Sequence, residues 1–181
     1  MQRGAQLVVL GSGDSALEAG LRMARKQHPQ QVGLHIGYNE ALAHRIEAGA
    51  DMFLMPSRFE PCGLNQIYSQ RYGTVPIVRS TGGLADTVVD TTVESLAGRK
   101  ATGFSFHKPV PEALWSAVRR ALDCFAQPEQ WQQLMMTGMQ QDFGWKQSAR
   151  QYIELYERIQ NGTTDSPAIR TQENQKTAAT S

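Results

Sequence analysis

The chain lacks long apolar runs, an excess of charge of either sign, and a cysteine framework. Its 181 residues carry 18 basic and 17 acidic side chains, a net charge of +1, so the charge balance gives no reason to expect nucleic acid or a membrane as a partner. No apolar stretch approaches the ~20 residues that span a bilayer, and residues 1–4 lack the apolar region of a secretory signal. Cys62 and Cys124 lie in unrelated contexts, which predicts a reduced, cytoplasmic protein.

A metal-binding pattern is lacking as well. The four histidines have no metal-like spacing with one another or with the two cysteines. We therefore predict no metal site and expect the histidines on the surface or in the core: His28, His35, His44 and His107.

Short apolar runs alternate with amphipathic segments along most of the chain. This alternation, with short loops, is typical of βαβ units and predicts an α/β fold around a parallel sheet. Residues 88–102 are polar and are predicted to be irregular. We expect strands at residues 7–10, 32–36, 52–55, 75–78 and 103–106, and helices or helical turns at residues 15–28, 39–49, 64–72, 82–86, 111–125, from 128 onward, and 145–159.

The last residues differ in composition from the rest. Residues 161–181 are rich in Thr, Gln, Asn, Ala and Ser, and Ile169 is their only large apolar side chain. Such a segment cannot bury enough apolar surface to offset the entropy lost on ordering. We therefore predict one domain at residues 1–160 and a disordered tail at residues 161–181.

The most informative segment is SRFEPCGL, residues 57–64, which follows a buried strand and leads into a helix. Ligands of open α/β sheets bind at the carboxyl ends of the strands, and the exposed amides of a first helical turn attract anions. Glu60 is useful beside an anion site only if it accepts hydrogen bonds from hydroxyl groups. The segment therefore predicts a ligand with both phosphates and hydroxyls, such as a nucleotide sugar.

This segment is followed by YGTVPIV at residues 72–78 and STGGLADTV at residues 80–88. The three segments, in this order, resemble bacterial glycogen synthase and plant starch synthase. These are retaining glucosyltransferases with two facing Rossmann-like domains, the GT-B architecture. The resemblance runs from about residue 6 to about residue 158 and implies most of the C-terminal, nucleotide-binding domain. It also implies that no metal and no cofactor is needed.

The resemblance implies a role for each residue of the central motif. Glu60 would be the catalytic-site carboxylate that accepts hydrogen bonds from the ribose hydroxyls. Cys62, Gly63 and Leu64 would contact the glucose and its diphosphate, largely through backbone N–H groups, and Asn65 would be a weaker phosphate contact. A nucleophilic role for Cys62 is the less favoured alternative, because no histidine is placed by sequence as its base.

Further donor-site residues are expected at other strand ends. The resemblance implies that Tyr38 lies against the adenine of ADP-glucose; an ordinary loop tyrosine is the alternative. Gly11 and Gly13 fit a dinucleotide fingerprint, but the acid expected at the end of the second strand is absent. We interpret them as a tight turn near the nucleotide. Thr81 and Gly82 form a strand–helix turn that the family places near the donor pocket.

The chain also departs from the family pattern. Tyr68 stands where relatives often have a second acid. The family's first strand, and the turn whose arginine and lysine grip the diphosphate, would fall before residue 1, and Arg3 and Lys26 match neither cation. We therefore expect a sheet that lacks its first strand and has two unpaired edges, and a polypeptide inactive by itself.

The aromatic residues near the end of the chain are expected to serve in core and interdomain packing rather than as a sugar platform: Trp131, Trp145, Tyr152 and Tyr156.

The resemblance implies transfer of glucose from ADP-glucose to the non-reducing end of an α-1,4-glucan, with retention at the anomeric carbon. The expected partners are ADP-glucose, the glucan acceptor and the N-terminal GT-B domain. A non-catalytic nucleotide- or glycan-binding paralogue and a UDP-sugar-dependent GT-B transferase are the alternatives. The Cys-Gly-Leu sequence after Glu60 and Pro61 favours ADP-glucose.

Overall fold

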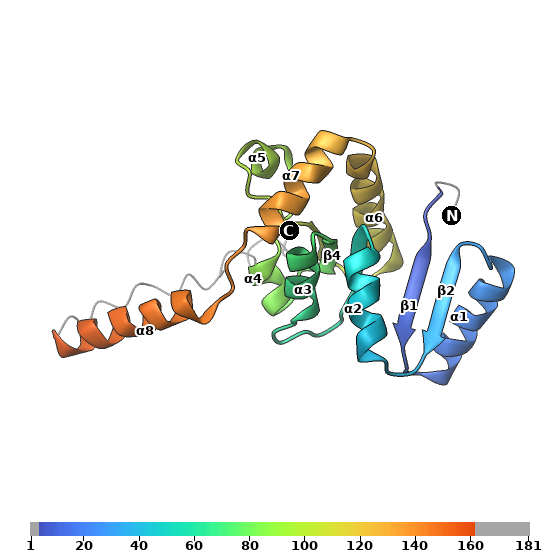
Figure 1. Ribbon diagram of the computed structural model, residues 1–181, viewed down its shortest axis with the longest axis horizontal. Coiled ribbons are helices and arrows are strands. Elements are labelled where there is room, and N and C mark those ends of the chain that lie inside the picture. The colour runs from blue at the N-terminus through green and yellow to red at the C-terminus, as the bar shows by residue number, and fades with distance from the viewer. Residues whose placement is uncertain (1–3, 162–181) are drawn as a thin grey trace, which may run out of the picture. The chain divides into compact units, whose positions relative to one another are not determined.

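A computed structural model describes residues 4–161, which fall into two compact units divided after Gln141. The first unit contains all the strands of the described residues (Figure 1). The predicted tail at residues 161–181 lies outside the described residues, except for Asn161. No helix in the described part of the chain is both long and apolar enough to cross a membrane.

The strands are parallel throughout, as predicted, but they form two separate sheets. β1 (Leu7–Gly11) pairs only with β2 (Val32–Ile36), and β3 (Met52–Met55) pairs with β4 (Val75–Arg79), which pairs with β5 (Phe104–Phe106). Within residues 4–161, one edge of β1 and one edge of β3 have no partner strand. The expected parallel α/β fold is confirmed, and the position of the family's first strand between these edges stays a prediction.

Local signals set the helix boundaries. The side chain of Asp14 accepts hydrogen bonds from the amides of Ala16 and Leu17 and begins α1, and Asn39 caps α2 in the same way. Gly73, at φ 83°, ends α3 in the left-handed conformation. The helices are α1 (Ser15–Gln27), α2 (Glu40–Gly49), α3 (Asn65–Tyr72), α4 (Gly83–Thr87), α5 (Val93–Ala97), α6 (Pro111–Phe125), α7 (Pro128–Met139) and α8 (Trp145–Gln160).

The prediction that residues 88–102 are irregular is partly wrong, because α5 lies within them. The side chain of Thr92 accepts a hydrogen bond from the amide of Ser95, and the hydroxyl of Ser95 accepts one from the amide of Thr92. This reciprocal capping box stabilises a helical turn. The polar residues that suggested a loop are therefore the residues that cap this helix.

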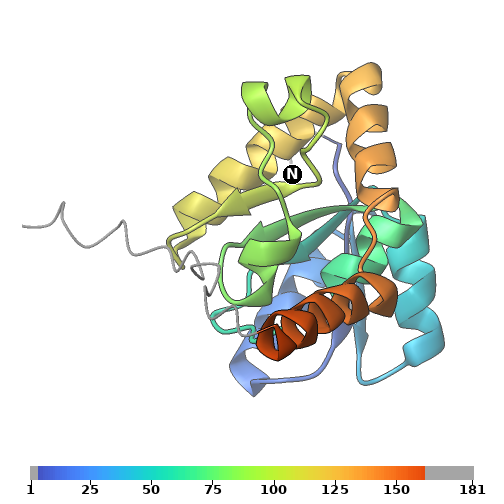
Figure 2. The same cartoon turned by 90° about the vertical axis from the view of Figure 1, so that its left-hand side faces the viewer.

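The main core lies where α6 and α7 pack on β4 and β5 (Figure 2). Ile77, Phe104 and Leu134 are at most 1% exposed, and the ring of Phe104 stacks on Trp131 at 6.5 Å between centroids. Trp131 is thus a core residue, as predicted. A smaller cluster beside Leu84 supports the turn that follows β4: Val78, Leu84, Val88 and the half-buried Met55.

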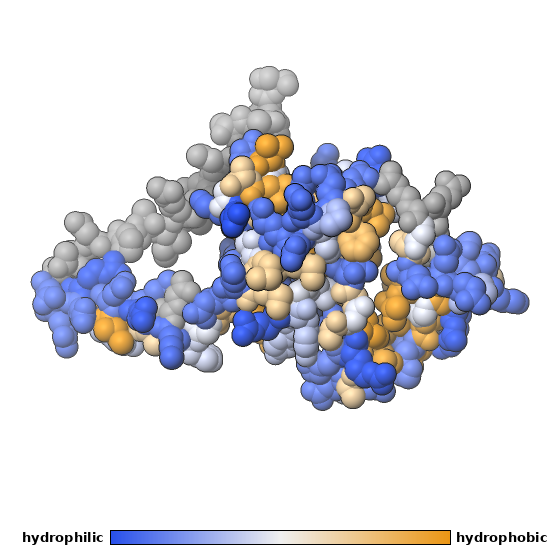
Figure 3. Space-filling view, turned by 45° about the horizontal axis from the view of Figure 1, so that its top comes forward, coloured by the Kyte–Doolittle hydropathy of each residue, from blue (hydrophilic) through white to orange (hydrophobic). Residues whose placement is uncertain are grey.

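The β1–α1–β2 segment buries much less. Val32 is its only buried residue, and Val8 and Leu17 are 54% and 71% exposed. Apolar side chains reach the surface on the face seen in Figure 3. Because hydrophobic stabilisation scales with the buried area, this segment contributes little to stability.

The last helix, α8, belongs to the second unit. Its aromatic residues Trp145, Tyr152 and Tyr156 are 88%, 59% and 60% exposed. Core packing of these three residues is therefore not seen within the described residues of the second unit, and their packing against a further domain stays a prediction. Their spacing places them along an apolar stripe of an amphipathic helix.

One buried carboxyl group lies in α2. Glu47 is 6% exposed and its Oε2 has no hydrogen-bond partner. Burial raises the pKa of Glu47, and the nearby His44 opposes this in part. The charged form is therefore less stable in the folded than in the unfolded protein, so the stability present below the unfolded pKa is lost as the pH rises through the folded pKa.

We expect Glu47→Gln to stabilise the protein at neutral pH. The gain should be on the order of 1 kcal/mol, or roughly 2–4 °C in Tm, and it should shrink toward pH 4 as the wild-type carboxyl becomes neutral. Thermal melts from pH 4 to pH 8 would check this. Glu40→Gln is the control, since Glu40 is exposed in the first turn of the same helix. Equal melting of wild type and Glu47→Gln at every pH would contradict the prediction.

Candidate functional site

Two loops interlock at the carboxyl ends of β3 and β4. A Cβ added to Gly82 would lie 1.9 Å from the carbonyl oxygen of Glu60, and one added to Gly83 would lie 2.0 Å from that of Cys62. Only glycine permits so close a backbone approach. The structure therefore brings the predicted residues of the central motif and those of the Thr81–Gly82 turn into one site.

A buried glutamine forms hydrogen bonds to both parts of this site. Gln66 is fully buried, and its Nε2 donates to the carbonyl oxygens of Cys62 at 3.3 Å and Gly63 at 3.0 Å and to Thr87 Oγ1 at 3.1 Å. The hydroxyl of Thr87 in turn donates to the carbonyl oxygen of Gly83 at 2.6 Å. One side chain thus joins the loop after β3 to α4. Sequence reasoning missed Gln66 and Thr87, because a glutamine in a helix gives no signal of burial.

The Glu60 carboxylate lies half-buried at the surface of the interlocked loops. Ser57 Oγ donates to Glu60 Oε2 at 3.4 Å, a long hydrogen bond. Arg79, the last residue of β4, donates to the carbonyl oxygens of Ser57 and Arg58 in the same loop. Sequence reasoning missed Arg79 too; its signal was a basic residue that closes an otherwise apolar strand.

The loop that carries Glu60 leads into the first turn of α3. Leu64 is the N-cap residue, and no side chain caps the turn. The amide of Ile67 donates to the carbonyl oxygen of Leu64 at 2.9 Å, and the amides that precede it in the turn are the ones suited to an anion. Gly63 has φ 73°, a left-handed conformation that favours glycine. Leu64 and Asn65 are exposed. A carboxylate and an uncapped first helical turn therefore lie within one short segment; their binding of hydroxyl groups and of an anion stays a prediction.

The other predicted donor-site residues lie on the β1–β2 sheet. The carbonyl oxygen of Gly11 accepts a hydrogen bond from the amide of Gly37 at 3.0 Å, and the amide of Gly13 donates to Glu18 Oε1 at 3.0 Å. Tyr38 follows β2 and is 87% exposed. These residues sit at the carboxyl ends of β1 and β2, on a different sheet from Glu60. Their contact with a nucleotide stays a prediction.

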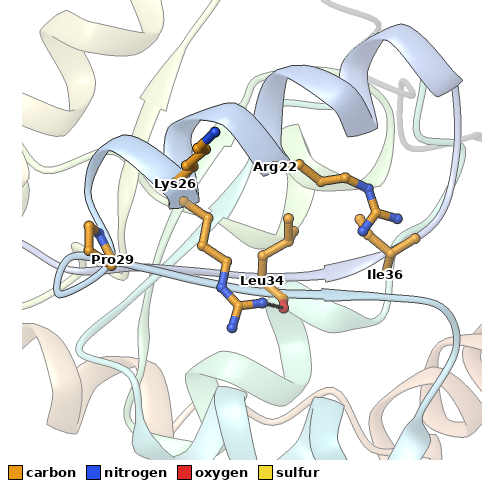
Figure 4. Close-up of a pocket in the computed structure, with 6 residues that line it drawn as sticks. Arg22, Lys26, Pro29, Leu34 and Ile36 are labelled. Carbon is orange, nitrogen blue, oxygen red and sulfur yellow. Dashed lines mark hydrogen bonds between the residues drawn. The ribbon is translucent and has the colours of Figure 1, made fainter.

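A surface pocket lies between α1 and β2 and contains none of the predicted site residues (Figure 4). It is lined by Arg22, Arg25 and Lys26 over the apolar Leu34 and Ile36. Arg25 Nη1 donates to the carbonyl oxygen of Leu34 at 3.1 Å. All three cations belong to α1.

The two cysteines differ in accessibility. Cys62 is exposed in the candidate site, whereas Cys124 is buried in α6 and burial raises the pKa of its thiol. We expect iodoacetamide to alkylate Cys62 and to leave Cys124 unmodified in the folded protein. ADP-glucose should slow the alkylation of Cys62 several-fold. Mass spectrometry of the peptides that contain Cys62 and Cys124 would measure both rates. An alkylation rate of Cys62 that is the same with and without ADP-glucose would count against its place in the donor site.

Comparison with known proteins gives a consistent result. The family model described as "Glycosyl transferases group 1" matches residues 1–134. The glycogen synthase of Thioalkalivibrio sulfidiphilus is 59% identical over 152 residues, which are 84% of this chain and 32% of that protein. The glycogen synthase of Haemophilus influenzae (strain Rd) is 50% identical over 159 residues, 88% of this chain and 33% of that protein.

Solved structures agree in fold. The catalytic domain of Starch Synthase IV from Arabidopsis thaliana, bound to ADP and acarbose, has a TM-score of 0.76 and 38% identity, over 87% of this chain and 33% of that one. Sucrose-phosphate synthase from Thermosynechococcus elongatus, at 23% identity over 87% of this chain and 39% of that one, shares the fold with a TM-score of 0.59. This chain spans about a third of the length of the curated relatives it matches. It belongs to the group 1 glycosyl transferases, within which it is a homologue of the glycogen synthases.

Proposed function

We propose that this chain is the donor-binding part of a glycogen synthase. The enzyme transfers glucose from ADP-glucose to the non-reducing end of an α-1,4-glucan, with retention at the anomeric carbon. Its partners are ADP-glucose, the glucan and the N-terminal domain of the GT-B architecture, and it acts in the cytoplasm. The observation that carries the proposal is the interlocked pair of loops, in which the backbone of Glu60 lies against Gly82 and the loop continues into the first turn of α3.

The chemistry requires stabilisation of a departing diphosphate and of an oxocarbenium-like glucose. The backbone N–H groups at Gly63 and Leu64 donate to phosphate or sugar oxygens, where negative charge develops in the transition state. Glu60 accepts hydrogen bonds from the ribose hydroxyls and so fixes the nucleotide relative to those amides. Tyr38 lies against the adenine, and Asn65, Thr81 and the glycine turns complete the donor pocket.

A chimaera tests the proposal. The aligned 152 residues of the Thioalkalivibrio sulfidiphilus glycogen synthase are replaced by those of this chain, whose 59% identity favours compatible packing. We expect the chimaera to incorporate labelled glucose from ADP-glucose into glycogen and to bind UDP-glucose more weakly in calorimetry. The polypeptide of 181 residues by itself should produce no glucan, because it spans only 32% of that relative.

The chimaera also separates the alternatives. A folded chimaera that binds ADP-glucose but transfers no glucose would indicate a non-catalytic paralogue. A chimaera that prefers UDP-glucose would indicate a UDP-sugar transferase. Either result would overturn the proposal, and circular dichroism with a cooperative thermal melt establishes that the chimaera is folded.

A further inference from the structure

Arg79 makes an unusual set of contacts at the end of β4. Its Nε donates to the carbonyl oxygen of Ser57 at 2.7 Å, its Nη2 donates to that of Arg58, and its Nη1 donates to that of His107 at 3.4 Å. The three acceptors come from the loop after β3 and from the residue that follows β5. One guanidinium group therefore joins the ends of three neighbouring strands.

These contacts bear directly on the loop that carries Glu60. The carbonyl groups of Ser57 and Arg58 turn toward the guanidinium, which fixes the peptide planes two and three residues before Glu60. The side chain of Ser57 also donates to the Glu60 carboxylate. Arg79 thus acts on Glu60 through the Ser57 backbone and hydroxyl, and it makes no hydrogen bond to the carboxylate among the contacts of the described residues.

The other side of the same loop is fixed by packing. The carbonyl oxygen of Glu60 lies against Gly82, three residues after Arg79 in the same segment. The loop is therefore held at both ends by residues 79–83, on one end by a charged side chain and on the other by direct backbone contact. The guanidinium contacts lie at residues 57 and 58 and the glycine contact lies at residue 60, so the two sets of contacts hold different parts of the loop.

We propose that Arg79 is a positioning residue that holds the Glu60 carboxylate in place for the ribose hydroxyls of the donor. This inference rests on the proposed function. Its chemical basis is the planar fork of the guanidinium, whose fixed N–H directions match several carbonyl groups at once. A lysine keeps the positive charge but presents a compact ammonium on a flexible stem, so it cannot hold the three carbonyl oxygens in the same geometry.

The competing role for a cation at this position is direct binding of the diphosphate. The two roles differ in which part of the nucleotide they affect. If Arg79 acts through Glu60, its loss weakens the binding of adenosine, AMP and ADP by the same factor, because all three carry the ribose. If Arg79 binds phosphate, the loss grows as phosphates are added.

The experiment uses Arg79→Lys in the chimaera, with Arg71→Lys as the matched control. Arg71 also donates to a carbonyl group, that of Met139, but lies on the exposed side of α3. We expect Arg79→Lys to raise the KM for ADP-glucose roughly 10-fold or more, as for a lost charged hydrogen bond, with the KM for glycogen unchanged. Calorimetry should show an equal loss for adenosine, AMP and ADP, and a reduced preference for ADP over 2′-deoxy-ADP and 3′-deoxy-ADP.

A double variant gives a second readout of the same coupling, and circular dichroism with a thermal melt establishes that each Arg79→Lys protein is folded. The double variant Arg79→Lys with Glu60→Gln should bind ADP no more weakly than Glu60→Gln does, because residues that act as one unit are not additive. A loss that grows from adenosine to ADP would overturn the positioning role, as would an unchanged KM in Arg79→Lys. If the unmodified chimaera itself does not use ADP-glucose, the proposed function fails instead.

Discussion

Gly82→Ala is expected to abolish glucosyl transfer and to destabilise the fold. Gly82 has φ 48°, and an added Cβ would lie 1.9 Å from the carbonyl oxygen of Glu60, a backbone atom that a side-chain rotation cannot move away. Backbone strain costs about 1–3 kcal/mol, and overpacking costs a further 1–3 kcal/mol or so. The loop with Glu60 must shift as a whole, so we expect kcat/KM for ADP-glucose to fall by at least about 100-fold, as in other misplaced sites.

Two other glycine substitutions serve as controls that separate a loss of stability from a loss of donor-site function. Gly20 lies in α1 with no atom within 4 Å of an added Cβ, so Gly20→Ala should leave activity unchanged and stabilise the helix by roughly 0.5–1 kcal/mol. Gly103→Ala would place a Cβ 2.4 Å from the carbonyl oxygen of Pro76, away from the site. It should lower Tm without raising the KM for ADP-glucose. A Gly82→Ala chimaera with wild-type kcat/KM would show that the two loops need not interlock.

The sequence predicted the elements whose boundaries depend on neighbouring residues. The predicted bounds of β2, β3 and α6 match the structure residue for residue, and the helix expected at residues 39–49 is α2 with Asn39 as its cap. Apolar periodicity and capping residues act over a few positions, so one sequence reveals them. Parallel pairing followed from the alternation of strands and helices.

The parts that sequence reasoning missed depend on contacts between distant residues. Gln66 meets Thr87 21 positions away, and Arg79 meets Ser57 22 positions away. Neither side chain has a local property that marks it as a tertiary hydrogen-bond donor. The motif residues Glu60 and Gly82 could be predicted because the family resemblance names them. Their direct contact could not, since it depends on how two turns approach in space.

Together these contacts indicate that the site is preorganised. Gln66 satisfies the carbonyl groups of Cys62 and Gly63 from the interior, Arg79 satisfies those of Ser57 and Arg58 at the strand ends, and the glycine turn closes the remaining side. The loop with these engaged carbonyl groups leads into the first turn of α3, which has no side-chain cap. Electrostatic stabilisation of a transition state is strongest when the donors need no reorganisation.

Glu60→Gln is expected to weaken the binding of ADP-glucose roughly 10- to 100-fold, the range of a lost hydrogen bond to a charged acceptor. The substitution keeps the shape of the side chain but removes the negative charge and leaves one oxygen as acceptor. Two ribose hydroxyls then compete for that oxygen. The new NH₂ group is a hydrogen-bond donor and faces hydroxyl groups that would themselves donate. The defect should appear both in the KM for ADP-glucose and in the affinity for ADP, because both ligands carry the ribose.

The change in relative affinity for ADP and its deoxy analogues tests whether the Glu60 carboxylate binds the ribose. Wild-type protein should prefer ADP over 2′-deoxy-ADP and 3′-deoxy-ADP, whereas Glu60→Gln should bind all three with similar affinity, because the hydroxyls no longer have their acceptor. Glu40→Gln, at an exposed acid in the first turn of α2, is the matched control and should keep the wild-type preference. If Glu60→Gln retained both its affinity for ADP and its discrimination against the deoxy nucleotides, Glu60 would have no role in ribose binding. The carboxylate would then be an exposed loop acid that serves only the local geometry set by Ser57 and Gly82.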